Sequence, residues 1–409
     1  MSKLFAVALG ILTAIGGFVD IGDLVTNAQV GARFGLSLAW ATLVGVLGIC
    51  VFAEMSGRVA AVSGRPTFDL VRERLGPRVG FLNLVSSMLI TFLTFVAEIG
   101  GVALSVQLAV SVHVLLIVPW VGVAVWLILW KAKFSIMENV LGLLGLALLV
   151  FGVALWQLGP DWGALLHQGV TAHKPSDQHW SSYAYYAVAL FGAAMTPYEV
   201  FFFSSGAVEE KWSVRDLNRS RANVLVGFPL GGVLSVSLAG CAAAVLLPQA
   251  IKVTSLSQVL LPVAQAGGKL LMAVILVGVV AATFGAALET TLSSGYTVAQ
   301  FFGWSWGKFR APAQAARFHL VMIIAVLAGS AVLLTGVDPI QVTELSVVFS
   351  AIALPLTYIP ILIIANDPQY MGRFVNGKVT GAFAIGYLAI IVIASVAAIP
   401  LMLVTGAGK

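Results

Sequence analysis

Charged residues are scarce in this sequence. Only 10% of the 409 residues are Asp, Glu, Lys or Arg, whereas soluble domains carry roughly 25%. Apolar residues make up 60% of the chain, and the mean hydropathy is +1.01, so a soluble protein is excluded. Apolar runs of about 20 residues, long enough to cross a bilayer as a helix, recur from end to end. We therefore expect a single transmembrane domain over 1–409 with the lipid bilayer as its solvent.

Cysteine and histidine are also rare, with 2 and 5 copies. Cys50 and Cys241 lie inside apolar runs, where a thiol behaves as a small hydrophobe rather than half of a disulfide. His167, His173 and His179 share a polar outer connection, and no fixed Cys/His spacing orients them as metal ligands. We interpret this connection as a solvated loop, and we expect no histidine inside a membrane span.

Enzyme motifs are missing from suitable places in the sequence. We find no His-Glu-x-x-His zinc motif, no glycine-rich phosphate loop and no Gly-x-Ser-x-Gly elbow where the chemistry would need them. We therefore expect neither an enzyme nor a resident cofactor.

The apolar runs predict eleven membrane-spanning helices. Their expected limits are 4–34, 37–62, 80–108, 114–130, 136–157, 182–207, 222–248, 270–300, 314–336, 341–365 and 381–404. Placing alternate connections on one side gathers 17 of the 22 Lys and Arg residues there. Because basic connections stay in the cytoplasm, we expect a cell inner (plasma) membrane protein with a cytoplasmic N-terminus and an outer C-terminus. The net charge of +5 reflects this asymmetry, so no nucleic-acid partner is expected.

Ionisable residues inside the spans are few, and each is a candidate for function because a charge in lipid is costly unless it meets a partner, an ion or water. The first span places Asp20 and Asp23 around Gly22, and the sixth places Glu199 beside Pro197. Glycine and proline favour non-helical backbone, so both spans are predicted to break there. Carbonyls and carboxylates at such breaks form an oxygen-rich cation site. The alternative is two tolerated kinks with hydrogen-bonded acids.

The two breaks fall at equivalent positions of two five-helix halves, as in inverted-repeat transporters. We expect these halves at about 4–157 and 182–365, followed by an extra helix at about 381–404.

Four further acids lie in or near spans. Glu98 in span three and Glu289 in span eight could each join the ion path or hydrogen-bond a neighbouring helix. Glu54 and Glu138, near cytoplasmic span ends, are expected to pair with Arg58 or Lys133 instead.

The sequence around both breaks resembles the NRAMP family of divalent-metal transporters, whose members have the LeuT fold. The family's Asp-Pro-Gly-Asn signature corresponds to Asp20-Ile21-Gly22-Asp23, and its Met-Pro-His-Asn signature to Thr196-Pro197-Tyr198-Glu199. Further similarity lies at 26–35, 62–65, 97–100 and 134–138, and runs through most of spans one to six. The resemblance implies an all-α LeuT-type 5+5 inverted repeat with broken helices 1 and 6. The implied metal ligands are Asp20, Asp23, Thr196 and Glu199, with Gly22, Tyr198 and Glu98 behind them or along the path.

Three departures from the family signatures make the implied site harder and more acidic. Thr196 stands where the family has a methionine, whose thioether favours transition metals, and Asp23 and Glu199 replace two asparagines. Met195 lies one residue away and is not counted as the missing ligand. Magnesium prefers oxygen ligands and keeps several waters, and calcium would fit the ligand types too. The resemblance to the NRAMP-related magnesium transporter branch implies Mg²⁺ as the transported ion, and Mn²⁺ also.

Proton coupling is expected to be absent. The family's span-three acid before the retained glutamate falls on Phe95, and its later sixth-span histidine falls on Phe203. Neither side chain can carry a proton. The resemblance therefore implies uncoupled uptake, driven by the concentration gradient and the membrane potential, with Glu98 as a group that could still titrate.

Three other readings stay open at this point. A LeuT-fold transporter of another small solute, or of an anion with a coupled cation, could use the same breaks. An intramembrane aspartyl protease needs two close carboxylates, but Asp20 and Asp23 share one segment, whereas such a dyad is expected from facing helices. The third is a sensor that binds metal without transporting it.

Overall fold

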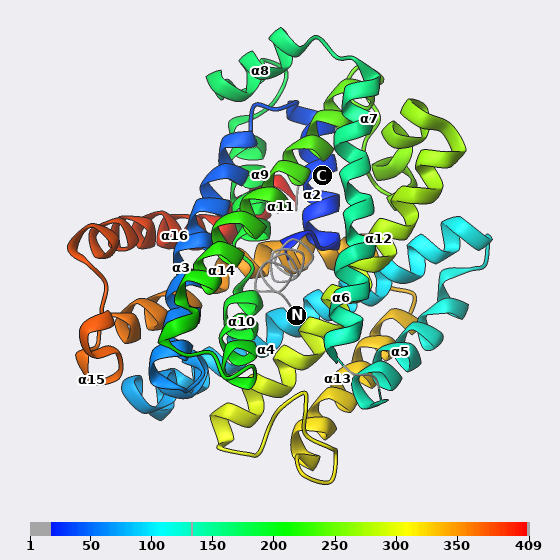
Figure 1. The fold of residues 1–409 in the computed structure, drawn as a ribbon. Helices are drawn as coiled ribbons and strands as arrows, with labels where there is room; N and C mark the ends of the chain where they lie inside the picture. The colour runs from blue at the N-terminus through cyan, green and yellow to red at the C-terminus, as the bar shows by residue number, and fades with distance from the viewer. Residues whose placement is uncertain (1–17, 132–133, 407–409) are drawn as a thin grey trace.

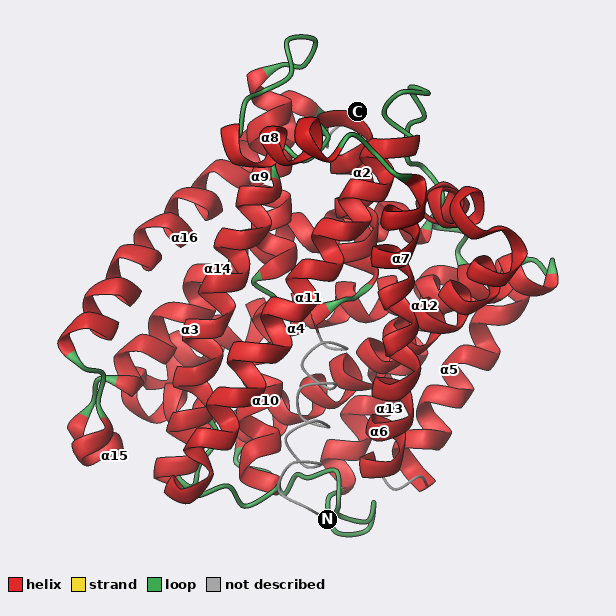
Figure 2. Ribbon diagram, turned by 45° about the horizontal axis from the view of Figure 1, so that its top comes forward, coloured by secondary structure: helices red, strands yellow, loops and turns green. Residues whose placement is uncertain are grey.

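The computed structural model describes residues 18–131 and 134–406, and within these ranges every regular element is a helix (Figure 1). Ten helical segments there are long and apolar enough to cross a membrane. The first expected span is described only from Phe18 onward, a piece too short to be counted with them. Figure 2 shows the long helices packed side by side, with the loops gathered at the ends of the bundle. The predicted all-helical membrane fold is confirmed.

Most spans lie within one long helix each. These helices are α3 (Ala39–Ser63), α4 (Thr67–Val110), α5 (Val114–Lys131), α11 (Leu217–Val245), α12 (Leu256–Phe302), α13 (Ala316–Leu334), α14 (Pro339–Ala365) and α16 (Lys378–Thr405). Two of them, α4 and α12, are kinked. The predicted fifth span consists of α6 (Phe134–Gly145), η1 (Leu146–Leu149) and α7 (Val150–Leu158). The remaining short helices outside the breaks are α8 (Trp162–Thr171), η2 (Val214–Asp216), α15 (Pro368–Met371) and η3 (Gly372–Phe374).

The first span breaks where the sequence predicts. Phe18 is helical, Val19 and Asp20 are not, and α2 (Ile21–Phe34) begins directly afterwards. Asp20 adopts extended backbone, with φ −102° and ψ −179°, and its carboxylate accepts a hydrogen bond from the Asp23 backbone N–H at 2.7 Å. A carboxylate in this position satisfies one of the N–H groups that a helix start leaves free. The acid that marks the break therefore also caps the helix that follows it.

The sixth span also breaks as predicted. Its first half is α9 (Trp180–Ala194) and its second half is α10 (Pro197–Glu209), with Met195 and Thr196 non-helical between them. Proline suits the first position of α10 because the N–H that it lacks would have no partner there.

Two helices are longer than the sequence predicts. In α4, Gly76 has φ +85° and separates an additional segment from the expected span at 80–108. In α12, Gly267 and Gly268 do the same ahead of the expected span at 270–300. Segments that the sequence places in connections are therefore helical, and they join the spans through glycine kinks.

The connection with three histidines, which the sequence predicts as a solvated loop, is partly helical. It contains α8, whose first N–H groups are capped by the Asp161 carboxylate, which accepts from Ala164 N at 3.0 Å.

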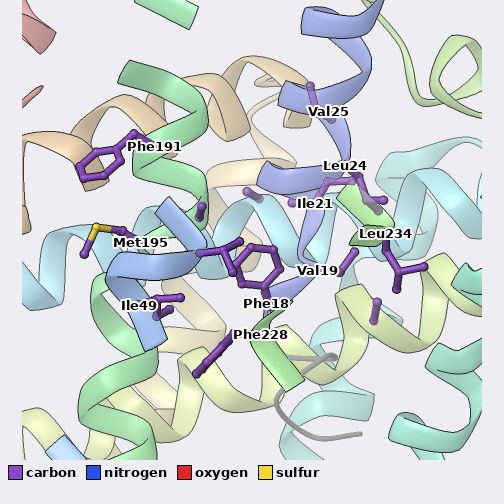
Figure 3. Packing of buried hydrophobic residues seen from close by; sticks show 14 of the residues in the cluster. Phe18, Val19, Ile21, Leu24, Val25, Ile49, Phe191, Met195, Phe228 and Leu234 are labelled. Carbon is purple, nitrogen blue, oxygen red and sulfur yellow. The ribbon is translucent and has the colours of Figure 1, made fainter. Parts of the chain in front are cut away.

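The broken helices lie at the centre of the bundle. The half-helix α2 packs against α9, α11 and α14, while α4 packs against α12 and α14. Gly31 lets α2 approach α11 closely, because a Cβ there would collide with the Ala239 carbonyl, as is common for small residues between membrane helices. Phe18 lies at the first break, and its ring centroid is 6.2 Å from that of Phe228 (Figure 3).

Candidate functional site

A small cavity lies between the two breaks and the helices that face them. Its lining comes from the first break and α2 (Asp20, Ile21, Gly22), the sixth span (Gly192, Ala193, Thr196), α4 (Thr94, Ala97, Glu98) and α14 (Thr343, Ser346, Val347, Ser350). The space within it that the centre of a water-sized sphere can occupy is about 10 Å³. One buried water needs about 10–15 Å³ on the same measure. In this conformation the cavity therefore has room for a single particle of that size.

Asp20 enters the cavity in a fixed orientation. Its Oδ1 atom is the one that accepts from the Asp23 N–H, so the start of α2 holds the carboxylate in place. The start of a helix also favours negative charge through its aligned peptide dipoles. The local backbone thus orients an acid that lies almost wholly out of contact with solvent, at 5% exposure.

Glu98 reaches the same cavity from α4. Its Oε1 atom accepts a hydrogen bond from the Ile21 backbone N–H at 3.1 Å. Its Oε2 atom is buried and has no hydrogen-bond partner among the residues that the structure describes. Of the two readings left open by the sequence, the hydrogen bond to a neighbouring helix is therefore present. The second oxygen belongs to a side chain that lines the cavity, so it is available to a ligand.

Thr196 and Gly22 complete the part of the lining nearest the breaks. The Thr196 hydroxyl donates to the Ala193 carbonyl at 3.0 Å, which leaves lone pairs on its oxygen for a cation. Gly22 keeps the cavity open, because an added Cβ would lie 3.0 Å from Val347 Cγ2 and 3.1 Å from Asp20 Oδ1.

Asp23 does not line the cavity in this conformation. Its Oδ2 atom accepts from the Ser235 hydroxyl on α11 at 2.6 Å, and its Oδ1 atom accepts from Asn27 Nδ2 at 2.8 Å. Both carboxylate oxygens therefore face protein donors, one of which ties α2 to α11.

Glu199 lies buried in the first turn of α10 and does not line the cavity either. Within residues 18–131 and 134–406, no group of three or more His, Cys, Asp or Glu side chains is arranged to hold a metal ion. Of the four predicted ligands, the cavity thus brings together Asp20 and Thr196, and adds Glu98.

Met195 and Tyr198, on either side of Thr196 and Pro197, are both buried. The Met195 sulfur packs at Gly48 of α3, where an added Cβ would lie 2.7 Å from it, and Figure 3 shows it pointing away from Phe18. The sulfur is therefore not directed into the cavity. The Tyr198 hydroxyl has no hydrogen-bond partner in the described part of the chain, and Tyr198 is not among the lining residues.

The two predicted coupling positions are packed in apolar surroundings. Phe95 is fully buried against Gly329 of α13, and the Phe203 ring meets Trp212 edge-on with centroids 5.5 Å apart. Neither lines the cavity.

The expectation that no span contains a histidine is wrong. His319 lies in the first turn of α13, and its Nε2 atom is 3.0 Å from the Arg310 carbonyl oxygen. The start of a span lies near the membrane surface, where a loop carbonyl can satisfy the ring. His319 is not part of the cavity lining.

The acids outside the site follow the sequence only in part. Glu54 pairs with Arg58 at 3.2 Å, as predicted, and also with Arg221 at 3.0 Å. Glu289 is buried on α12 and does not line the cavity. The pairing proposed for Glu138 and Lys133 lies outside the described side chains.

Sequence reasoning missed the wall formed by α14. Thr343, Ser346 and Ser350 all line the cavity, and the Ser346 hydroxyl lies 2.9 Å from that of Thr94 on α4. Their spacing of three, four and seven residues places them on one face of an apolar helix. This periodic row of hydroxyls was the signal that could have identified them.

Comparison with known proteins extends these observations to the whole chain. The model of the family Nramp, described as natural resistance-associated macrophage protein-like, matches residues 10–400. The divalent metal cation transporter MntH of Deinococcus radiodurans is 28% identical over 379 residues, which cover 88% of this chain and 82% of that protein.

Solved structures with the same arrangement of helices include a manganese transporter of Eremococcus coleocola. It has a TM-score of 0.68 at 19% identity and covers 96% of this chain and 85% of its own. A Na⁺-coupled sialic acid symporter has a TM-score of 0.65 at 12% identity, covering 97% and 88%. MHP1, a nucleobase-cation-symport-1 family transporter, has a TM-score of 0.61 at 15% identity and covers 96% of this chain and 91% of its own. At these identities the likeness concerns the fold, and the predicted LeuT-type architecture is confirmed.

Proposed function

This chain belongs to the natural resistance-associated macrophage protein-like family, and we propose that it carries divalent metal cations across the inner membrane, with Mg²⁺ as the main substrate and Mn²⁺ as another. It is a multi-pass membrane transporter rather than an enzyme. We also propose that the N-terminus is cytoplasmic and the C-terminus outside, because this orientation puts most basic connections in the cytoplasm. The two repeats would occupy about 4–157 and 182–365 of one transport domain, with the helix at about 381–404 added to them.

The donor set of the cavity carries the proposal of a hard ion. Asp20, Glu98, Thr196, Thr94 and the α14 hydroxyls offer only oxygen, and among the residues that the structure describes no sulfur or nitrogen side chain lines the cavity. Oxygen ligands suit Mg²⁺ and Mn²⁺, whereas thioethers favour softer metals. The orientation of the Met195 sulfur toward α3 agrees with this choice.

Asp23 and Glu199 complete the proposed ligand set in a second conformation. Asp23 is bound to Ser235 in the conformation described here, so it would have to exchange that hydroxyl for the ion. Half-helices that shift relative to their neighbours are the usual basis of alternating access in transporters with inverted repeats. Movement of α2 relative to α11 would release Asp23, and Glu199 would approach with the start of α10.

The proposed transport moves no protons. Phe95 and Phe203 are packed in apolar surroundings and cannot titrate, and His319 lies away from the cavity. Uptake of a divalent ion alone is electrogenic. The membrane potential then contributes about 4.6 kcal/mol per 100 mV, twice the value for one charge.

Ion uptake into proteoliposomes tests the proposal. Mg²⁺, Mn²⁺ and Ca²⁺ are compared at a fixed inward gradient, with a pH-sensitive dye inside and the potential set by potassium and valinomycin. We expect Mg²⁺ and Mn²⁺ uptake that a negative interior accelerates, without acidification. Absence of divalent uptake would overturn the function. Acidification that follows metal entry and disappears in Glu98→Gln would overturn the uncoupled mechanism alone.

The other readings have less support from the geometry. A transporter of an organic solute could have the same fold, as MHP1 and the sialic acid symporter do. The cavity of about 10 Å³, however, is much too small for an organic solute in this conformation. A protease dyad would need Asp20 and Asp23 to face each other, whereas Asp23 bonds to Ser235 and Asn27.

A further inference from the structure

A second and larger cavity opens where α10 ends, at the loop that follows α12. Its volume is about 630 Å³, within the range of roughly 300–1,000 Å³ that small-molecule sites occupy. It lies on the side of the protein where basic residues gather, the proposed cytoplasmic face. None of the residues of the ion cavity lines it.

The charged groups of this pocket are mainly basic. Lys211 and Arg310 line it, and neither forms an ion pair with another residue that the structure describes. Glu209 is also in the lining, but its Oε2 atom accepts a hydrogen bond from the Tyr296 hydroxyl at 2.6 Å. Its other oxygen packs against Gly307, which has no Cβ to obstruct it. The carboxylate is therefore held against the wall, and the two cations remain for a ligand.

The rest of the wall is aromatic. Trp304 already contacts other side chains, because it stacks on Phe302 with centroids 5.0 Å apart and has the Arg317 guanidinium 5.2 Å from its ring centroid. Trp306 meets Tyr296 edge-on at 5.5 Å, so Trp306 and Phe309 are the rings that remain for a ligand. Phe309 also lines the pocket and is 60% exposed. Planar rings beside cations suit an anion that carries a planar group, because the rings stack on its face while Arg and Lys bind its charge.

The loop that carries these rings reads Gly-x-Ser-x-Gly from Gly303 to Gly307. Both glycines have positive φ, +68° and +142°, so they give the loop turns that other residues rarely adopt. The loop follows the end of a helix rather than a strand, which excludes the nucleophile elbow of a hydrolase. Its role is therefore better explained by the pocket that it lines.

We propose that this pocket binds a nucleoside phosphate, with Arg310 and Lys211 on the phosphate and the base against the aromatic wall. A phospholipid headgroup offers the same phosphate chemistry but has no planar base, so the rings favour the nucleotide. Val208 and Glu209, which line the pocket, are at the end of α10. A ligand here would contact the half-helix whose start borders the ion cavity.

The test measures binding of AMP to the full chain in nanodiscs of zwitterionic lipid, without divalent cations and with a chelator present. Adenosine and inorganic phosphate are measured alongside. We expect saturable AMP binding that is about tenfold or more tighter than either part alone, because the charged and the stacking contacts contribute together. Binding of AMP no tighter than adenosine, or none below about 1 mM, would overturn the proposal.

Variants connect the binding to the pocket. Arg310→Gln and Lys211→Gln should each weaken AMP binding by about tenfold, and Phe309→Leu by about fivefold. Arg215→Gln is the matched control, since Arg215 is an exposed cation near the end of α10 that does not line the pocket. An equal loss of AMP affinity in Arg215→Gln would show that AMP responds to positive charge in general rather than to this pocket, and it would overturn the proposal.

Nanodiscs with phosphatidylglycerol separate the two phosphate sources. One outcome is that phosphatidylglycerol is retained in a way that depends on Lys211 and Arg310, while AMP binds in neither kind of nanodisc. The ligand would then be a phospholipid headgroup, and the proposal would be overturned. The assay contains no transported metal, so its outcome is independent of the proposed transport function.

Discussion

Ser235 offers the sharpest test of how the ion site assembles. Its hydroxyl donates to Asp23 Oδ2 at 2.6 Å across the contact between α2 and α11. If Asp23 must leave this bond to reach the ion, the hydroxyl competes with the metal. A hydrogen bond to a charged group contributes about 1.5–3 kcal/mol, and 1.4 kcal/mol corresponds to about a tenfold change in an equilibrium constant. Ser235→Ala should therefore lower the Mg²⁺ concentration for half-maximal binding by about tenfold.

The measurement is Mg²⁺ binding by calorimetry on purified protein, with uptake into proteoliposomes as a second readout. Ser237→Ala is the matched control, because Ser237 lies on the same helix, is only half-buried, and donates its hydroxyl to the Val233 carbonyl at 2.8 Å. Ser235→Thr keeps a hydroxyl and should bind as the unmodified protein does. Weaker Mg²⁺ binding in Ser235→Ala would show that Ser235 positions Asp23 for the ion. Unchanged binding would show that Asp23 does not exchange partners.

Other substitutions test two further proposed ligands and one charged group outside the site. Thr196→Met should shift competition for uptake toward Cd²⁺ and Mn²⁺, because sulfur binds softer metals, and an unchanged potency of Cd²⁺ would exclude Thr196 as a ligand. Asp20→Asn should abolish uptake more completely than Thr196→Ala, since a charge near the ion contributes more than a neutral oxygen. The pKa of Asp367 is held below its ordinary value of 3.8 by the Gln369 backbone N–H and by Arg74. Asp367→Asn should therefore lower the melting temperature at pH 7, and the difference should close as the pH falls below about 3.8; a constant difference would contradict this.

The breaks could be predicted because their causes are local. Asp20 caps the helix that begins one residue later, and Pro197 suits the first position of α10, whereas Gly22 is itself helical. The direction of the Asp23 side chain has no such local cause. It depends on how α2 meets α11, which small residues such as Gly31 decide by close contact with a helix far along the chain. Sequence pattern therefore identified the acids of the site but not the partner that each one faces.

The wall formed by α14 was missed for a related reason. Ser346 and Ser350 carry no charge, and a hydroxyl in an apolar helix is ordinarily satisfied by its own backbone, as Thr343 is by the Pro339 carbonyl. The structure gives Ser346 a different partner, Thr94 on α4. Only the packing of α4 against α14 distinguishes the two cases.

Asp20 and Glu98 serve the fold and the candidate site with different atoms. Asp20 Oδ1 and Glu98 Oε1 each accept from one of the free N–H groups at the start of α2, those of Asp23 and Ile21. Removing either carboxylate therefore disturbs the break itself as well as any bound ion. Glu98→Gln retains an oxygen for the Ile21 N–H while it removes the charge, whereas Glu98→Ala removes both. Because of this difference, a defect in ion binding that Gln and Ala share equally points to the second oxygen and its charge, and a defect confined to Ala points to the cap.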